Sequence, residues 1–209
     1  MLYSFDNEER LVANGENSPP STTNLEWIQG GFVHAQYSIE TKYVSDPKYA
    51  LFAKYIPNAR TYLCPSDPPN ITLDEYSYAR VRSYELNCYV GWEGDWDFRL
   101  PGDFKVFRKQ QQISPTPSEI FLFQDVNPKS ICWPHFGVRM DESSFFNFPS
   151  SAHSRGGIIS YCDGHVAYHR WEDQRTVTAF AGSYHAHHQP SPGNPDLAWL
   201  RNHTTVPKQ

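Results

Sequence analysis

The sequence predicts an α+β fold: an antiparallel β-sheet with little helix and long loops. Aromatic residues make up 15% of the 209 residues, and proline occurs 17 times but methionine only twice. This composition favours a β-rich, loop-rich domain over a helical bundle. The net charge is −5 and no cluster of Lys or Arg stands out, which argues against nucleic-acid binding. We expect one soluble domain over residues 1–209, because the sequence has no long apolar run and no signal peptide.

The first part of the chain predicts few regular elements. Residues 1–45 show no sustained period and are rich in turn-forming residues, so irregular structure is expected there. A helix is predicted after a cap at Ser45 or Asp46, and Pro57 would end it. A short strand is expected over residues 59–64, followed by a proline-rich turn.

The second part predicts the sheet itself. Side chains alternate over residues 78–92, which is typical of a half-buried strand. The apolar run within residues 119–125 predicts a central strand, buried on both faces. Residues 157–171 predict a hairpin, because an Asp-Gly turn separates two β-rich runs. Residues 127–151 form a long loop between these strands, and residues 196–200 predict a last helical turn.

Four polar side chains around this hairpin are the first candidates for a site: His153, Asp163, His165 and His169. His165 and His169 would lie on one strand face but about 13 Å apart, so they cannot share a metal ion. Three interpretations stay open. Asp163 and Gly164 make the turn while His153 bonds locally, which we favour; or Asp163 helps to bind calcium; or His153 and Asp163 act in catalysis.

Two further polar segments have a structural and a functional interpretation. The histidine-rich segment 185–188 predicts a solvated loop, with weak metal binding as the alternative. The acidic and aromatic segment 91–98 predicts an exposed loop, with a grip on sugar as the alternative. Asn70 and Asn202 match glycosylation acceptors, which matter only in a secreted eukaryotic protein.

The four cysteines do not form a metal-binding or redox motif. No two of them are spaced as C-x-x-C, which argues against a zinc knuckle or a thioredoxin-like site. The even number permits two disulfides, and four buried free thiols are the alternative. The cysteines are Cys64, Cys88, Cys132 and Cys162.

Seven motifs follow one another in the order of a known family. They are YLCPSDPP, RSYELNCYV, SPTPSEIFLFQDV, the histidine at 153, DGHV, HRW and NPDLAWL. Nine residues separate His153 from Asp163. In this spacing the chain resembles the prepilin-type-processing-associated H-X9-DG family, which are pseudopilin-like proteins related to type II secretion pseudopilins and type IV pilins. The resemblance covers residues 45–200 and leaves 201–209 as a tail.

This resemblance implies a non-enzymatic structural subunit. Full-length members carry a leader, a prepilin peptidase site, an apolar anchor helix and a C-terminal antiparallel sheet. Leader and helix are absent here, so the chain is expected to be the soluble head of an inner-membrane-anchored or filament-incorporated protein, at the periplasmic or extracellular face. Expected partners are other pilin-like subunits or secretion-system proteins, with protein or polysaccharide cargo, and no nucleic acid. No cofactor is expected, and calcium is the one ion considered.

The same resemblance gives two expectations for individual residues. An extracytoplasmic location favours disulfides, and Cys64–Cys88 is the favoured pair, because both lie beside strands that enter one sheet. His153 and Asp163 are expected to fix the loop entering the last hairpin, through a bond between them or from each to local backbone. Gly164 and His165 complete this structural motif.

Two other functions remain as alternatives. An extracytoplasmic carbohydrate-binding module would align the rings of Trp92, Trp96 and Trp133 on one open face. A metal-dependent hydrolase would bring His153 and Asp163 together around an ion in a pocket.

Overall fold

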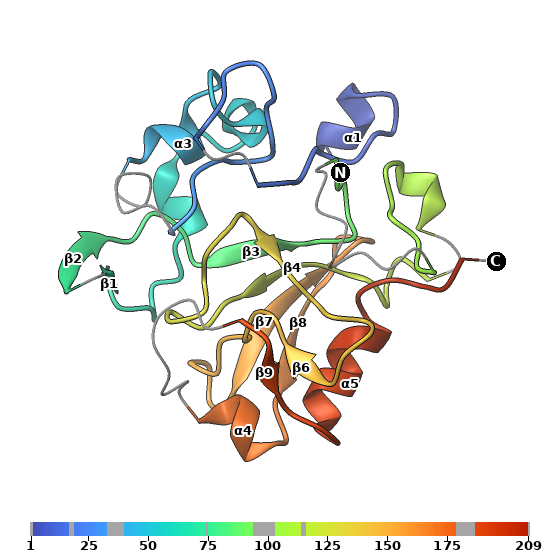
Figure 1. Ribbon diagram of the computed structural model, residues 1–209. Helices are drawn as coiled ribbons and strands as arrows, with labels where there is room; N and C mark the ends of the chain where they lie inside the picture. Colours follow the sequence, from blue (N-terminus) through green and yellow to red (C-terminus); the bar gives the residue numbers. More distant parts are fainter. Residues whose placement is uncertain are drawn as a thin grey trace.

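A five-stranded sheet organises the molecule. We describe it from a computed structural model, in which residues 2–16, 19–32, 40–73, 75–93, 103–113, 116–178 and 187–208 are described. The strand order is β5-β3-β4-β7-β8, and Figure 1 labels β3, β4, β7 and β8 of this sheet. In that order the strands are His135–Phe136, Tyr84–Asn87, Phe121–Asp125, Gly156–Tyr161 and Val166–Arg170.

The pairing of these strands confirms the α+β class. β3 with β4, β4 with β7, and β7 with β8 pair antiparallel. β3 and β5 pair parallel, so the expectation of a wholly antiparallel sheet is wrong in this one pair. The apolar run predicted to be central is β4, which has two strands on each side. The predicted hairpin is β7–β8, and Gly164 in its turn has a φ of 95°, which glycine adopts without strain.

Smaller elements surround the sheet (Figure 1). Two further strand pairs, β1 with β2 and β6 with β9, lie outside it. They run over Asn70–Leu73, Tyr76–Ala79, Ser144–Phe145 and Gln189–Pro190. The α-helices are α1 at Leu2–Asp6, α3 at Lys42–Ser45, α4 at Gln174–Val177 and α5 at Pro195–Asn202. No helix in these described stretches is both long and apolar enough to cross a bilayer.

The helix α5 confirms the predicted last helical turn and extends it. The side chain of Asn194 accepts the backbone N–H groups of Asp196 and Leu197, which caps the helix. Leu197 and Leu200 are buried. Thr204 beyond the helix is also buried, so the segment expected to be a tail packs against the domain.

The prediction of one helix that begins after Ser45 or Asp46 and ends at Pro57 is wrong. α3 ends at Ser45, and a short 3₁₀ helix follows at Leu51–Lys54. Asp46 lies between them with φ −100° and ψ 122°. A residue before proline avoids the helical region, and Asp46 also accepts the N–H of Lys48 in a local turn. Asp46 therefore separates two short helices instead of capping a long one.

Two predicted strands also differ. Residues Ala59–Tyr62 form a 3₁₀ helix, because the side chain of Asn58 accepts the N–H of Arg60 and caps it. The alternation over 78–92 is divided between β2 and β3. Arg80 lies at this break, and its guanidinium donates to the Pro68 carbonyl and the Asp67 carboxylate.

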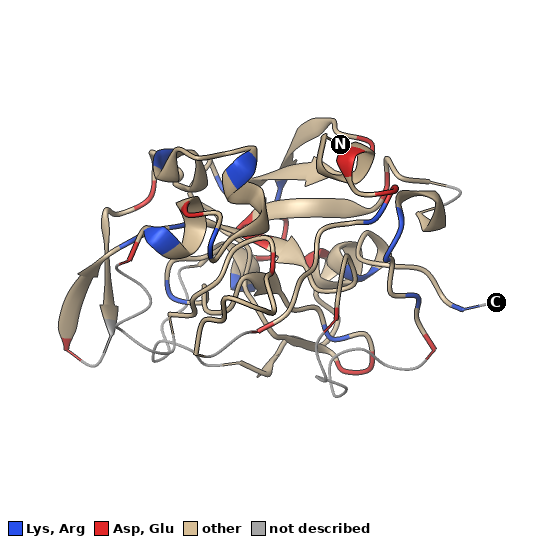
Figure 2. Cartoon of the chain, turned by 90° about the horizontal axis from the view of Figure 1, so that it is seen from above, with Lys and Arg blue, Asp and Glu red and all other residues tan. Residues whose placement is uncertain are grey.

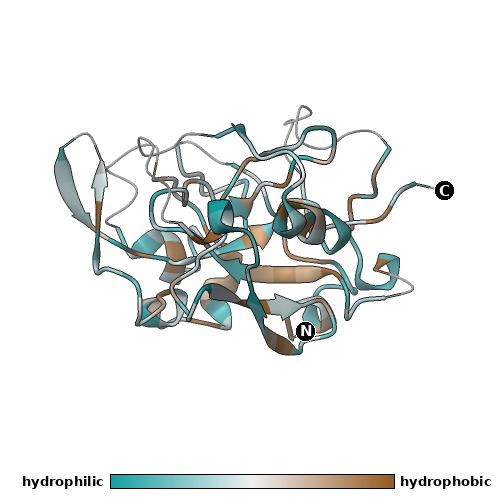
Figure 3. Cartoon of the chain, turned by 90° about the horizontal axis from the view of Figure 1, so that it is seen from below, coloured by the Kyte–Doolittle hydropathy of each residue, from teal (hydrophilic) through white to brown (hydrophobic). Residues whose placement is uncertain are grey.

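The sheet carries a hydrophobic cluster on each face. One includes Phe121 and Ile159 and extends to α5; the other includes Leu86 and Trp27 and extends to the N-terminal segments. Accordingly α4 and α5 lie on one side of the sheet in Figure 1, and α1 and α3 on the other. Figure 3 shows hydrophobic strand segments in the middle of the molecule. Residues 1–45, expected to be irregular, thus contribute core side chains such as Val12.

Candidate functional site

His153, the first residue of the H-X9-DG spacing, lies over the end of the central strand. Its Nε2 atom is 3.1 Å from Oδ2 of Asp125, the last residue of β4, and 3.4 Å from Sγ of Cys64. A tight turn holds it there: the backbones of His153 and Gly156 bond in both directions, at 3.2 and 3.0 Å. Ser154 and Arg155 inside this turn have positive φ. The backbone conformation of Ser154 and Arg155 is therefore strained, and this strained turn places the His153 imidazole.

Asp125 is the buried partner in this pair. Its Oδ2 also accepts the N–H of Ile158 at 3.0 Å, while Oδ1 has no hydrogen-bond partner among the described residues. Burial raises the pKa of Asp125 to about 6, although the Ile158 N–H and His153 act in the opposite direction. Tyr84 pairs with Asp125 across β3 and β4. Burial and the nearby charge of Asp125 raise the pKa of the Tyr84 phenol.

The geometry of the three side chains indicates a structural tie. In a nucleophile–histidine–acid triad, one ring nitrogen faces the nucleophile and the other faces the acid. Here the same nitrogen, Nε2 of His153, faces both Cys64 and Asp125. This arrangement joins the loop before β7 to β4 and to the segment before β1, and it differs from the triad arrangement, in which the second ring nitrogen would face the acid.

An apolar groove of about 540 Å³ adjoins this tie. The sheet lines one side with Tyr84, Phe123 and Ile158, and Trp27 and Phe52 lie among the residues of the other. Val166 belongs to the same lining and is 63% exposed. Because β8 is the outer strand of the sheet, the groove reaches the open edge of the molecule.

Asp163 and Gly164, the second half of the H-X9-DG motif, lie at the opposite end of β7 from His153. Oδ1 of Asp163 accepts the backbone N–H of His165 at 3.0 Å and approaches its Nδ1 at 2.7 Å. The backbone N–H of His165 is the main cause of a lowered pKa at Asp163. The His165 ring stacks on Tyr161, with 4.2 Å between centroids. Asp163, Gly164 and His165 therefore form a locally bonded turn.

The expected partnership of His153 with Asp163 is wrong. The six residues of β7 separate them, which corresponds to about 20 Å. The second form of that expectation, a bond from each residue to local backbone, does hold: the N–H of His153 donates to the Gly156 carbonyl, and Oδ1 of Asp163 accepts the N–H of His165. The ring of His153 is paired with Asp125 instead of Asp163. The pocket that a metal-dependent hydrolase would build from these two side chains is not formed. In the parts of the chain that are described, no three His, Cys, Asp or Glu side chains are grouped to hold a metal ion.

The expected disulfide Cys64–Cys88 is also wrong, because all four thiols are free and buried. The N–H of Cys64 donates to Oγ of Ser83, the residue before β3, whereas Cys88 follows the end of β3. A strand of four residues spans about 13 Å, and a disulfide requires Cα atoms within about 7 Å. Both cysteines lie beside the same strand, but at opposite ends of it.

The histidine-rich segment is only partly described, since His185 lies outside the described residues. His187 is not a solvated side chain. Its ring stacks on Phe146 with 4.0 Å between centroids, and its Nδ1 lies 2.8 Å from the Phe146 carbonyl oxygen. The prediction of a solvated loop is therefore wrong at this residue.

The aromatic row expected of a carbohydrate-binding module is not formed as predicted. Trp92 is only 2% exposed, and its ring meets His135 edge-on at 4.9 Å. Trp133 is half-buried. Trp96 lies outside the described residues, with the acidic residues Asp95 and Asp97 of the same segment.

Sequence reasoning missed Asp125, which is the central residue of the tie. The available signal was a carboxylate two residues after a continuous apolar run, at the end of a central strand, where an unpaired charge would be unfavourable. Comparison of the chain with protein-family models, curated proteins and solved structures finds no match.

Proposed function

We propose that the chain is the head of a non-enzymatic, pilin-like structural subunit of a type II secretion pseudopilus or a type IV pilus-like system. The H-X9-DG spacing carries this proposal, because it corresponds to one structural unit. His153 ties the start of β7 to β4, and Asp163 with Gly164 builds the turn at its end. The spacing thus fixes both ends of one sheet strand, which is a structural role.

The apolar groove supports a role in subunit contacts. A head domain in an assembly needs a surface that a neighbour can cover, and large exposed apolar patches mark such surfaces. Val166 and Tyr168, on one edge strand, are 63% and 48% exposed. Under this proposal the neighbours are other pilin-like or secretion-system proteins, at the periplasmic or extracellular face, and no cofactor is involved.

Fractionation of native cells tests the proposal. An antibody to the chain should detect it with the inner membrane or with sheared surface filaments, together with other pilin-like subunits identified by mass spectrometry. Val166→Arg should fold normally, because Val166 is exposed, and should be depleted from the assembly. Tyr76→Arg, at a 68% exposed residue outside the main sheet, is the matched control. Recovery of the wild-type chain only as a free cytosolic protein would contradict the proposal.

A further inference from the structure

A basic pocket lies on the part of the molecule where residues 9–11 run beside residues 107–112. The N–H of Leu11 donates to the Arg108 carbonyl and the N–H of Gln110 to the Glu9 carbonyl, both at 2.9 Å. Arg10 and Lys109 face each other in this antiparallel contact. Two segments almost 100 residues apart in sequence are thereby fixed by main-chain bonds. The pocket between them has a volume of about 290 Å³.

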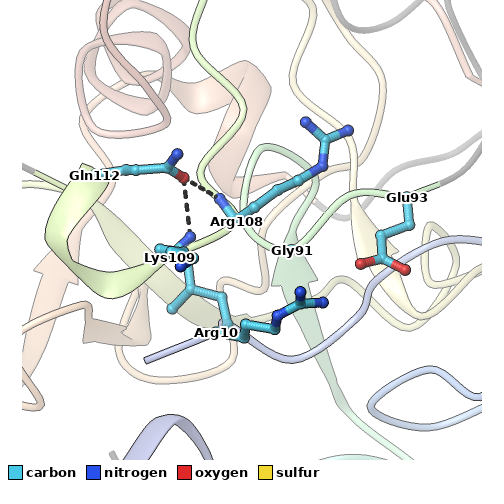
Figure 4. A pocket seen from close by; sticks show the side chains of 7 residues that line it. Arg10, Gly91, Glu93, Arg108, Lys109 and Gln112 are labelled. Atoms are coloured by element: carbon cyan, nitrogen blue, oxygen red, sulfur yellow. Dashed lines mark hydrogen bonds between the residues drawn. The ribbon is translucent and has the colours of Figure 1, made fainter. Parts of the chain in front are cut away.

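Three cationic side chains line this pocket: Arg10, Arg108 and Lys109. Figure 4 shows the two guanidinium groups and the carboxylate of Glu93 around the opening. Within the described residues, none of the three cations is in an ion pair. This gathering is local, because basic and acidic residues are otherwise interspersed along the chain (Figure 2).

The other polar side chains of the lining are Gln112, which can donate to a ligand, and Glu93, which can accept. Oε1 of Gln112 accepts the backbone N–H groups of Arg108 and Lys109, at 2.6 and 2.9 Å. This leaves the Nε2 group of Gln112 to donate. Glu93 is the one acidic residue of the lining. The pocket therefore offers several charged or neutral N–H donors and a single carboxylate.

The ligand that fits this pocket carries an oxyanion, which the cations would bind, and at least one hydroxyl group, which Glu93 would bind. Cations held together in one place repel one another, and a bound dianion relieves that repulsion. Arginine binds phosphate oxygens through two parallel hydrogen bonds, and lysine adds a point charge. The carboxylate of Glu93 can accept a hydrogen bond from a hydroxyl group. At about 290 Å³, the pocket lies at the small end of ligand sites.

We infer that this pocket binds the phosphate monoester of a small polyhydroxylated molecule. The cations and Gln112 hold the phosphate, and Glu93 accepts a hydrogen bond from a hydroxyl group of the ligand. This inference is independent of the proposed structural function, since the pocket is lined by residues outside both the H-X9-DG spacing and the apolar groove.

Calorimetric titration of the full chain with glucose 6-phosphate, inorganic phosphate and glucose tests the inference. Glucose 6-phosphate should bind saturably and more tightly than inorganic phosphate, and glucose should not bind. Binding should weaken as salt rises from about 50 to about 300 mM, because the charges are exposed. Arg108→Gln should weaken binding by about tenfold or more, since a charged hydrogen bond is lost. Arg170→Gln, at an exposed arginine on β8, should leave it within about twofold.

Glu93→Gln separates the two parts of the inferred site. It should weaken binding of glucose 6-phosphate but not of inorganic phosphate. Equal binding by the wild type and Arg108→Gln, or no saturable binding by the wild type, would overturn the inference. Sedimentation with phosphatidylcholine vesicles containing phosphatidic acid supplies a further arm. Binding to these vesicles without binding to glucose 6-phosphate would also overturn it, because the phosphate would then belong to a lipid.

Discussion

Nε2 of His153 lies 3.1 Å from Oδ2 of Asp125, so the histidine of the H-X9-DG spacing is paired with the central strand and not with the aspartate ten positions later. Asp125 is almost completely buried, while the His153 side chain is 26% exposed. The pair is thus a contact between the core and the surface. Its stability should depend on pH in the range where the Asp125 carboxyl changes charge.

Asp125→Asn should change how stability depends on pH. Burial raises the folded-state pKa of Asp125 from 3.8 to about 6, so the folded state favours the protonated carboxyl. The stabilisation by this group is complete below about pH 4 and is lost as pH rises through about 6. The free energy of unfolding of the wild type, relative to that of Asp125→Asn, should therefore fall by about 1–3 kcal/mol between these values.

Urea unfolding at several pH values measures this difference. His153→Gln serves as the second variant, because His153 lowers the pKa of Asp125. Without the imidazole the folded-state pKa of the Asp125 carboxyl should be higher, so the loss of stability should extend to a higher pH and become larger. A difference between wild type and Asp125→Asn that does not vary with pH would show that Asp125 is not shifted.

The cysteines give a prediction that does not require a mutation. All four are free and buried, and burial raises the pKa of Cys88 and of Cys162 to about 12. Since the thiolate is the reactive form, maleimide should label the folded protein slowly. After unfolding without reductant, mass spectrometry should find four labels per chain. Two labels would indicate one disulfide and would contradict the four free thiols of the structure.

Gly91 and Gly193 form a matched pair for the effect of a side chain at positive φ. Their φ angles are 67° and 66°, and no atom lies within 4 Å of a Cβ at Gly193. A Cβ at Gly91 would collide with the carbonyl oxygen of Val12. Gly193→Ala should cost about 1 kcal/mol from its backbone conformation alone. Gly91→Ala should cost about 3 kcal/mol or more, because backbone must also move.

Thermal or urea unfolding of the two variants provides the comparison. Similar losses of unfolding free energy in both would show that the close approach of Val12 to Gly91 does not constrain the fold.

The sequence predicted those elements whose signals are local. The apolar run of β4 and the Asp-Gly turn of the β7–β8 hairpin are examples, because each signal lies within the element that it defines. The helix expected after Asp46 failed because the restriction that proline places on its neighbour outweighed the apolar pattern.

The contents of the candidate site could not be predicted in the same way. His153, Asp125 and Cys64 are separated by 28 and 61 residues along the chain and meet only when β4 and β7 pair. Spacing along the sequence indicated His153 and Asp163 as partners, but an extended strand between two residues holds them apart. The residues of the basic pocket likewise come together only through long-range backbone bonds.

Glu85 provides the last prediction, on the other face of the sheet from Asp125. It is fully buried, and burial raises its pKa well above the usual value although Arg82 acts in the opposite direction. Its Oε1 accepts the N–H of Cys132 at 2.9 Å, while Oε2 has no hydrogen-bond partner in the described part of the chain. Its neighbour across the sheet is Gln124, whose amide nitrogen and oxygen also lack partners there.

Glu85→Gln keeps an oxygen for the Cys132 N–H and removes a buried charge. Because the folded-state pKa of Glu85 is raised, the wild type loses stability as pH rises through that pKa. Glu85→Gln should therefore be at least as stable as the wild type at pH 7, and its advantage should grow with pH. Glu85→Ala is the contrasting variant and should cost about 2–4 kcal/mol, because it leaves a cavity and an unpaired N–H. If urea unfolding instead finds Glu85→Gln as unstable as Glu85→Ala, then Glu85 is ionised in the core and its attraction to Arg82 exceeds the cost of burying the pair.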